Sequence, residues 1–203
     1  MSHIAGLVLA GGQATRMGGG QKALLEVSGV PLIERALERL GPQVDGVAIS
    51  ANREIERYEG FGHPVLKDTL ADFPGPLAGV LAGLNWGKAN GFSHILSVAA
   101  DTPFFPHSLG EDLKAAGGPI SMAATRDQER GAMRQPTFAL WPVDLADDLE
   151  ASLRAGTRKI VAWANPHGVE MVVYEPDPFD PFFNVNTPDD MKQAEAYVAE
   201  FAL

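Results

Sequence analysis

A glycine-rich segment with two cations, residues 9–22, carries the clearest chemical signal in the sequence. Two glycines directly follow an apolar run, three more come a few residues later, and the cations are Arg16 and Lys22. Glycines let the backbone approach phosphate groups and turn its N–H groups toward them. Arg16 and Lys22 would add positive charge where a triphosphate lies. The segment therefore predicts a phosphate-binding loop rather than an ordinary turn.

Two widespread phosphate loops do not fit this segment. A Walker loop needs a glycine before its lysine and a serine or threonine after it, whereas Lys22 lies between Gln21 and Ala23. A dinucleotide fingerprint needs the spacing Gly-x-Gly-x-x-Gly, which residues 12–15 break. The loop therefore belongs to a different phosphate-binding class.

Asp101 directly follows the apolar run 94–100 and precedes a threonine and a proline. A carboxylate at the carboxyl end of a buried strand is well placed to hold a hard cation, and Mg²⁺ bound beside phosphates needs only one or two carboxylates. Taken alone, an Asp-Thr-Pro turn without a ligand is the simpler interpretation. Together with the glycine-rich loop, a magnesium-binding role is favoured. The histidines are scattered, without the paired spacing of a metal site.

Further polar segments lie at the ends of predicted elements. Asn52 follows the apolar run 44–50 and, by itself, is better interpreted as a helix cap. Residues 67–79 predict a turn followed by a helix N-terminus. Thr187, followed by Pro188 and acidic residues, predicts a capped helix start.

Strands and helices are predicted to alternate along the chain. Apolar runs predict strands at 4–10, 44–50, 64–67, 94–100, 120–125, 137–141 and 169–174, the last nearer a sheet edge. Helical patterns predict helices at 31–40, 144–154 and 188–201, and a small-residue helix beginning at 76–84, whose glycines would let it lie close to a sheet. We expect Trp86, Trp141 and Trp163 to pack in or around the core.

This alternation predicts a single α/β domain, residues 1–203, with a mostly parallel central sheet and helices on both faces. The segment 175–183, rich in proline and aspartate, is expected to be a loop within that domain. Ligands of such sheets bind beyond the carboxyl ends of the strands. That rule selects the loops after Ala10, Ser50, Lys67 and Ala100.

The composition limits the partners of the chain. Its formal net charge of -10 disfavours a broad nucleic-acid or anionic-membrane surface. The absence of cysteine excludes disulfides, cysteine-ligated metals and a thiol nucleophile. No stretch is long enough to span a bilayer, and the start lacks the basic segment of a secretory signal, so we expect a cytoplasmic protein.

The glycine-rich loop resembles the signature of Rossmann-like nucleotidyltransferases, and in detail that of molybdenum cofactor guanylyltransferases. That family carries Leu-Ala-Gly-Gly, then Arg-Met-Gly, then a lysine, as Leu9–Gly12, Arg16–Gly18 and Lys22 do here. Relatives that use CTP more often carry Leu-Ala-Ala-Gly, so Gly11 favours guanine. The family often has an acidic residue just before the lysine, where this chain has Gln21. The resemblance covers nearly the whole chain and implies a nucleotide-diphospho-sugar transferase-like fold.

The resemblance also implies roles for individual residues. The residues expected to act in catalysis are Arg16, Lys22 and Asp101, of which Asp101 is the magnesium ligand. The residues expected to bind the nucleotide are Leu9, Ala10, Gly11, Gly12, Lys22, Asn52, Asp68 and Asp101. On the acceptor side we expect Gln135, Asn184 and Asn186.

The implied reaction is the transfer of GMP from GTP to the terminal phosphate of molybdopterin, with release of pyrophosphate. The implied cofactor is Mg²⁺, for which Mn²⁺ can substitute, and transient contact with molybdoenzymes or their chaperones is expected. One alternative is a related enzyme that uses CTP on molybdopterin or a sugar 1-phosphate as acceptor; Leu9–Gly12 and Gly75–Gly79 argue against CTP. The other is a non-catalytic nucleotide-binding protein that delivers the cofactor, against which the intact Arg16, Lys22 and Asp101 argue.

Overall fold

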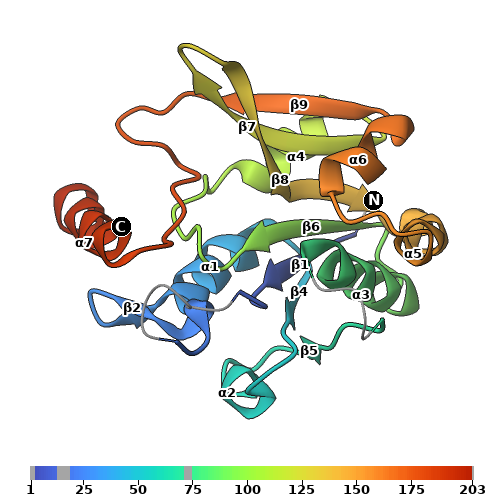
Figure 1. The fold of residues 1–203 in the computed structure, drawn as a ribbon, viewed down its shortest axis with the longest axis horizontal. Coiled ribbons are helices and arrows are strands. Elements are labelled where there is room, and N and C mark those ends of the chain that lie inside the picture. The colour runs from blue at the N-terminus through green and yellow to red at the C-terminus, as the bar shows by residue number, and fades with distance from the viewer. Residues whose placement is uncertain (1–2, 13–18, 71–74, 203) are drawn as a thin grey trace.

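A computed structural model describes residues 3–12, 19–70 and 75–202 of the chain. A sheet of seven strands forms its centre (Figure 1). These strands are β1 (Ile4–Leu9), β4 (Gly46–Ser50), β5 (Val65–Leu66), β6 (His94–Ala99), β7 (Ile120–Asp127), β8 (Gly131–Pro142) and β9 (Val169–Tyr174). A separate two-stranded hairpin consists of β2 (Glu26–Val27) and β3 (Val30–Pro31).

The strand order in the sheet is β5-β4-β1-β6-β8-β7-β9. β8 pairs antiparallel with both of its neighbours, β6 and β7, whereas all other neighbouring pairs are parallel. The predicted mostly parallel α/β sheet is therefore confirmed, and β9 lies at an edge as expected.

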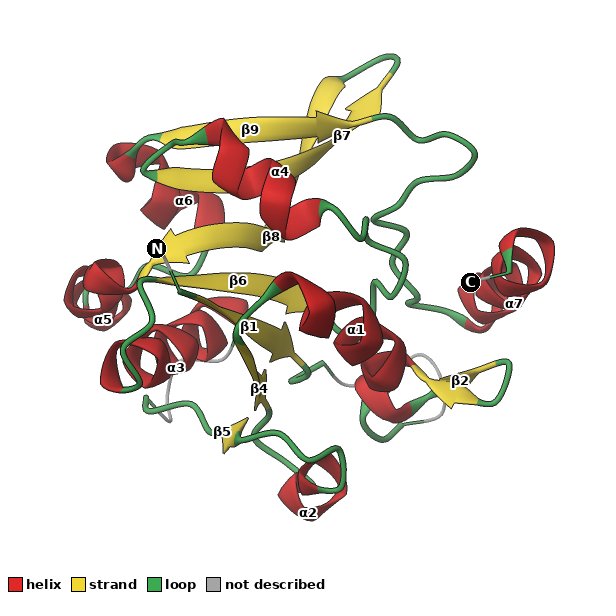
Figure 2. Cartoon of the chain, turned by 180° about the vertical axis from the view of Figure 1, so that it is seen from behind, coloured by secondary structure: helices red, strands yellow, loops and turns green. Residues whose placement is uncertain are grey.

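Helices cover both faces of the sheet. They are α1 (Leu32–Leu40), α2 (Ile55–Glu59), α3 (Pro76–Ala89), α4 (Leu109–Ala116), α5 (Ala146–Arg154), α6 (Ile160–Ala164) and α7 (Pro188–Phe201). Short 3₁₀ helices span Lys22–Leu24, Gly41–Gln43, Val143–Leu145 and Asn165–His167. Figure 1 shows α3, α5 and α6 in front of the sheet, and Figure 2, the view from behind, shows α1 and α4 in front of it.

Successive side chains of β1 enter different halves of the core. Ile4 and Val8 pack with the apolar side chains of α1 and α4, whereas Ala5 and Leu7 pack with those of α3, α5 and α6. Because a strand alternates its side chains between the two faces, a strand covered on both sides must be apolar throughout. This burial explains why β1 is recognisable in the sequence as a continuous apolar run.

The glycines of α3 bring this helix close to the sheet, as the sequence predicts. A Cβ atom added at Gly83 would lie 2.5 Å from Leu7 Cδ2, and one at Gly79 would lie 2.6 Å from Ser50 Oγ. Such distances are shorter than atomic contact, so a side chain at either position would push the helix away from β1 and β4. The glycines therefore set the distance between α3 and these two strands.

Several elements were not anticipated from the sequence. The β2–β3 hairpin turns through Ser28 and Gly29, both with positive φ, and has strands of two residues each. α2 and α6 have five residues each, too few for a periodic pattern to stand out. β8 begins at Gly131 and not at the predicted residue 137; the sequence did not indicate its first half, because that half is partly exposed and lacks an apolar run.

The tryptophans pack as expected. Trp141 and Trp163 are buried with their rings 5.5 Å apart, and partly buried Trp86 packs against the same cluster. The indole N–H of Trp141 donates to Ser97 Oγ at 2.8 Å. None of the helices in the described ranges is long and apolar enough to cross a membrane.

Candidate active site

A cleft of about 730 Å³ opens at the carboxyl ends of the parallel strands. It is lined by residues at or after four neighbouring strands: Leu9, Gly11 and Gly12 (β1), Ser50, Asn52 and Arg53 (β4), Lys67 and Asp68 (β5), and Ala99 and Asp101 (β6). The N-terminus of α3 forms another wall. The structure thus places the loops that the sequence selects around one cavity, because parallel strands end at the same edge of a sheet.

Lys22 is the centre of a polar cluster beside this cleft. Its ammonium group donates to Asp101 Oδ2 at 2.5 Å, to Asn184 Oδ1 at 3.0 Å and to Asn186 Oδ1 at 2.5 Å. Lys22 is only 6% exposed, so these three oxygens replace the water that would otherwise solvate its charge. The backbone N–H of Lys22 donates to the carbonyl of Gly12 and so ties the lysine to the end of β1.

The loop between β9 and α7 supplies the two asparagines. The N–H of Val185, between them, donates to the carbonyl of Asp101 at 2.8 Å. Thr187 caps α7 in a capping box with Asp190, which confirms the predicted helix start. Asp190 Oδ2 also accepts from the N–H of Asn186. The backbone bond of Val185 therefore holds the two asparagines beside Asp101, and the bond to Asp190 attaches them to the start of α7.

Asn52 and Asp68 form a second polar pair at the same cleft. Asn52 Nδ2 donates to Asp68 Oδ2 at 2.7 Å, and the N–H of Asp68 donates to Asn52 Oδ1 at 2.8 Å. The interpretation of Asn52 as a helix cap is wrong, because α2 is preceded by Glu54 and has no side-chain cap. The loops after β4 and β5 lie close enough for Asn52 to bind Asp68 instead.

The other carboxylate oxygen of Asp68, Oδ1, is buried and has no hydrogen-bond partner among the described residues. Burial raises the pKa of Asp68, and the hydrogen bond from Asn52 opposes that rise. A buried acceptor without a donor is costly. A ligand that brings N–H groups to this wall of the cleft would remove that cost.

Comparison with known proteins identifies the family. The profile of the MobA-like NTP transferase domain family matches residues 6–169. A molybdenum cofactor guanylyltransferase from Mesorhizobium japonicum is 43% identical over 94% of this chain and 94% of its own length. A second, from Cereibacter sphaeroides, is 43% identical over 98% of this chain and all of its own length. The chain belongs to the molybdenum cofactor guanylyltransferase family.

Solved structures agree with this membership. The molybdopterin-guanine dinucleotide biosynthesis protein A of Archaeoglobus fulgidus superposes with a TM-score of 0.74 at 26% identity, over 97% of this chain and 99% of that chain. The 4-diphosphocytidyl-2C-methyl-D-erythritol synthase of Anaerococcus prevotii has a TM-score of 0.77 at 15% identity, over 98% of this chain and 97% of that chain, and shares the fold.

Most of the residues that the family resemblance selected meet at the cleft. Those that line it are Leu9, Gly11, Gly12, Asn52, Asp68, Asp101 and Asn184. Ala10 is buried behind the loop, and Lys22 and Asn186 belong to the cluster described above. Arg16 lies outside the described residues. Gln135 is not among the residues that line the cleft; it donates to Thr125 Oγ1 at 3.1 Å.

Several residues of the cleft were missed by sequence reasoning. Arg53 and Lys67 follow β4 and β5, and Gln21 and Thr137 come from the segment before Lys22 and from β8. Arg53 and Lys67 are single exposed cations, which no local pattern distinguishes from surface residues. Their position after two neighbouring strands is the one signal that could have selected them.

The donor set at Asp101 fits a magnesium ion held beside phosphates. The described residues contain no group of three or more histidine or acidic side chains that could bind a metal alone. Mg²⁺ that shares its shell with substrate phosphates needs only one or two carboxylates. Asp101 provides one, with its side chain 23% exposed at the cleft.

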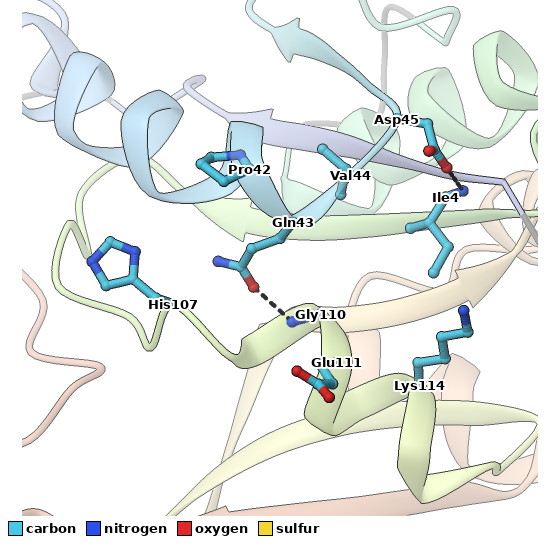
Figure 3. Close-up of a pocket in the computed structure, with 9 residues that line it drawn as sticks. All are labelled: Ile4, Pro42, Gln43, Val44, Asp45, His107, Gly110, Glu111 and Lys114. Carbon is cyan, nitrogen blue, oxygen red and sulfur yellow. Dashed lines mark hydrogen bonds between the residues drawn. The ribbon is translucent and has the colours of Figure 1, made fainter.

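A second cavity, of about 450 Å³, lies between the segment that follows α1 and helix α4 (Figure 3). It includes Ile4, at the end of β1 away from the first cleft. Two of the polar side chains that line it bond to the backbone. Gln43 Oε1 accepts from the N–H of Gly110, and Asp45 Oδ2 accepts from the N–H of Ile4 (Figure 3). These bonds attach α4 and the loop before β4 to the sheet, so we assign this cavity to the packing of the fold.

Proposed function

We propose that this chain transfers GMP from GTP to molybdopterin, with or without bound molybdenum, and releases pyrophosphate. The product is the molybdopterin guanine dinucleotide cofactor. The observation that carries the proposal is the buried Lys22, held by Asp101 and two asparagines beside a cleft that begins at the glycine-rich loop. The relatives named above support the choice of both substrates.

The reaction needs positioning and charge neutralisation rather than a general base. An oxygen of the terminal phosphate of molybdopterin attacks the α-phosphorus of GTP, and the bond from that phosphorus to the β-phosphate oxygen breaks. The attacking phosphate is already an anion, so no proton must be removed. Holding two anions in line for this displacement is the task of the protein.

Lys22 would place a fixed positive charge next to the leaving pyrophosphate, with Arg16 proposed to assist from the glycine-rich loop. Asp101 is the residue that would hold Mg²⁺. A bound magnesium ion supplies neutralisation of phosphate oxygens. The backbone N–H groups of Gly11 and Gly12 are proposed to contact the phosphates, as the lack of side chains there permits.

Asp68 and the first turn of α3 would select guanine. Oδ1 of Asp68, which no described residue bonds, can accept from the ring N1–H and the exocyclic amine of guanine, groups that cytosine does not present in this arrangement. The N-terminus of α3 lines the same cavity at Gly75 and Pro76, and a backbone N–H group of this first turn, other than at Pro76, would donate to the guanine carbonyl. Guanine carries its carbonyl, N1–H and amine side by side on one edge, which an acceptor next to a donor can match.

On the acceptor side, Asn184 is proposed to contact molybdopterin, because it lines the cleft while holding Lys22. Gln135 and Asn186 would act there through the residues they bind. We further propose that the protein works as one domain in the cytoplasm and contacts molybdoenzymes or their chaperones transiently when it passes on its product.

Release of pyrophosphate from each of GTP, CTP, ATP and UTP, measured with purified protein, Mg²⁺ and molybdopterin, tests the proposal. GTP alone should support release that depends on molybdopterin. Preference for CTP would preserve the chemistry but contradict the substrate. Nucleotide binding without release would favour a delivery protein and overturn the proposed catalysis.

A further inference from the structure

The side chain of Gln21 takes part in none of the contacts described so far. This residue directly precedes Lys22 in the glycine-rich loop, is 8% exposed and lines the cleft. Its carboxamide forms no hydrogen bond within the described ranges of the chain. Neither its oxygen nor its nitrogen is fully enclosed by protein, so a ligand in the cleft can reach the carboxamide.

The backbone around Gln21 holds this residue firmly. Its carbonyl accepts from the N–H of Leu24 at 3.1 Å, and the N–H of the next residue, Lys22, donates to the carbonyl of Gly12 at 3.1 Å. Gln21 is thus tied to the same turn that carries Gly12 and Lys22. Its side chain lies where the proposed function places phosphates, not where it places the base.

A largely buried amide that no protein group satisfies is available to form hydrogen bonds with a ligand in the cleft. All three ammonium hydrogens of neighbouring Lys22 are used by Asp101, Asn184 and Asn186, so within the described residues the N–H groups of Gln21 are the unengaged donors beside it. An amide N–H is a donor without net charge and suits an anionic oxygen. A phosphate oxygen is therefore a suitable partner for the N–H groups of Gln21.

We propose that Gln21 is a further substrate-binding residue, which donates its carboxamide N–H to a phosphate oxygen in the pyrophosphate portion of the nucleotide. This inference rests on the proposed function, since it assumes that a nucleoside triphosphate fills the cleft. It assigns to Gln21 a contact with the part of the substrate that leaves, separate from the guanine contact proposed for Asp68.

Calorimetric binding of three probes tests this subsite: pyrophosphate, which has no base; guanosine, which has no phosphate; and GTP. The variants are Gln21→Leu, which removes the donor, and Gln21→Glu, which keeps the shape and adds a negative charge. Gln193→Glu, at an exposed position of α7, adds the same charge away from the cleft and is the matched control.

Gln21→Leu should weaken pyrophosphate and GTP binding about tenfold, because a hydrogen bond to a charged group is lost. Gln21→Glu loses the same amide donor and restores the acidic residue that the family often carries at this position, so it should also weaken both about tenfold. Guanosine binding should not change in either variant, and the control should bind all three probes like the parent protein.

Unchanged pyrophosphate affinity in both folded variants would overturn the proposal, and so would a loss of guanosine binding in place of pyrophosphate binding. If Gln21→Leu does not fold, Gln21→Glu decides by the same criterion. The proposed function is judged separately, by turnover of GTP with molybdopterin in the parent protein. A parent enzyme that turns over GTP, with variants that bind pyrophosphate normally, would refute this subsite alone.

Discussion

The ammonium group of Lys22 shows how one residue combines stability with function. A charge this deeply buried is tolerated because Asp101, Asn184 and Asn186 accept all of its hydrogens. If Lys22 is to reach a phosphate, at least one of these oxygens must give up its hydrogen bond. The amide oxygens are the weaker acceptors, so we expect an asparagine contact, rather than the Asp101 contact, to be exchanged.

Replacement of Asp101 should separate turnover from folding. Asp101→Asn keeps an oxygen that can accept from Lys22 but removes the negative charge. We expect turnover to fall at least a hundredfold, while the melting temperature drops by only a few degrees, as measured by pyrophosphate release and thermal unfolding. Asp101→Ala leaves the buried ammonium without its carboxylate and should cost more stability. Near-normal turnover of a folded Asp101→Asn variant would remove Asp101 from the catalytic site.

Asp68 should give nucleotide binding a pH dependence. Burial raises its pKa, so the carboxylate becomes protonated at a higher pH than an exposed aspartate would. Protonation removes the acceptor proposed for guanine, so GTP affinity should fall as the pH is lowered through that raised pKa. In Asp68→Asn, GTP affinity should be lower at neutral pH and lose this dependence, as calorimetry at several pH values can measure.

The raised pKa of Asp68 also affects the stability of the folded protein. Because the pKa of Asp68 is raised by folding, the folded state holds its proton more tightly, and the charged form costs stability at neutral pH. Asp68→Asn should therefore melt slightly higher than the parent at neutral pH, with the gain shrinking as the pH falls. A lower melting temperature at neutral pH would mean that the free carboxylate oxygen has a stabilising partner.

Among the elements, α3 depends on glycine for its distance from the sheet. Gly83→Ala raises helix propensity by about 1 kcal/mol but places a methyl group 2.5 Å from buried Leu7. We expect a net loss of about 1–2 kcal/mol and a drop of several degrees in melting temperature. Gly60→Ala is the control, since exposed Gly60 has a right-handed helical backbone and its added methyl would lie no closer than 3.5 Å to another atom.

A melting temperature for Gly83→Ala equal to or above that of Gly60→Ala would contradict the close packing of α3. Both substitutions add the same methyl group to a right-handed backbone. Gly60 lies at the exposed end of α2, whereas Gly83 is packed against β1.

The β9–α7 loop is attached to the sheet through Thr125. This buried hydroxyl donates to Asp180 Oδ1 at 3.1 Å and accepts from Gln135 Nε2 at 3.1 Å. Thr125→Val removes both bonds and should cost about 1–2 kcal/mol of stability. Because the same loop carries Asn184, turnover should also fall several-fold, as measured by pyrophosphate release at a temperature where the variant is fully folded.

Thr157→Val is the matched control for Thr125→Val, because the Thr157 hydroxyl makes no hydrogen bond within the described residues. It should leave turnover unchanged. If Thr125→Val lowers the melting temperature without affecting turnover, the attachment serves folding alone and the loop keeps its asparagines in place by other contacts.

At the scale of the whole molecule, the cleft draws residues from both ends of the chain. Gly11 lies at its beginning and Asn184 near its end, and both line one cavity. We therefore predict that the chain unfolds in a single cooperative transition. GTP with Mg²⁺ at about 100 times its dissociation constant should stabilise the fold by about 2.7 kcal/mol and raise the melting temperature by about 5–10 °C.

Differential scanning calorimetry can check this prediction. Equal calorimetric and van't Hoff enthalpies, with the whole transition shifted by GTP, are the expected result. Two transitions, of which GTP moves only one, would divide the chain into separate units.

The acidic composition gives a further expectation: with a net charge of -10, the chain should bind anionic nucleotides only where cations such as Lys22, Arg53 and Lys67 concentrate.

The sequence by itself determined the features that depend on neighbouring residues. Continuous apolar runs marked β1 and β6 because both faces of these strands are covered, and Thr187 with Asp190 marked the start of α7 because a capping box is local. The glycine-rich loop and Asp101 were recognisable because each directly follows such a run. Short or partly exposed elements such as α2 lack this local signal.

Only the tertiary structure decided which of these groups meet. Lys22 binds Asn184 and Asn186, which lie 162 and 164 residues away along the chain, and Asn52 binds Asp68 instead of capping a helix. The burial of Gln21 and the free oxygen of Asp68 are equally invisible in a linear pattern. Such contacts depend on the order of strands in the sheet, which the packing of the whole chain selects and no single segment encodes.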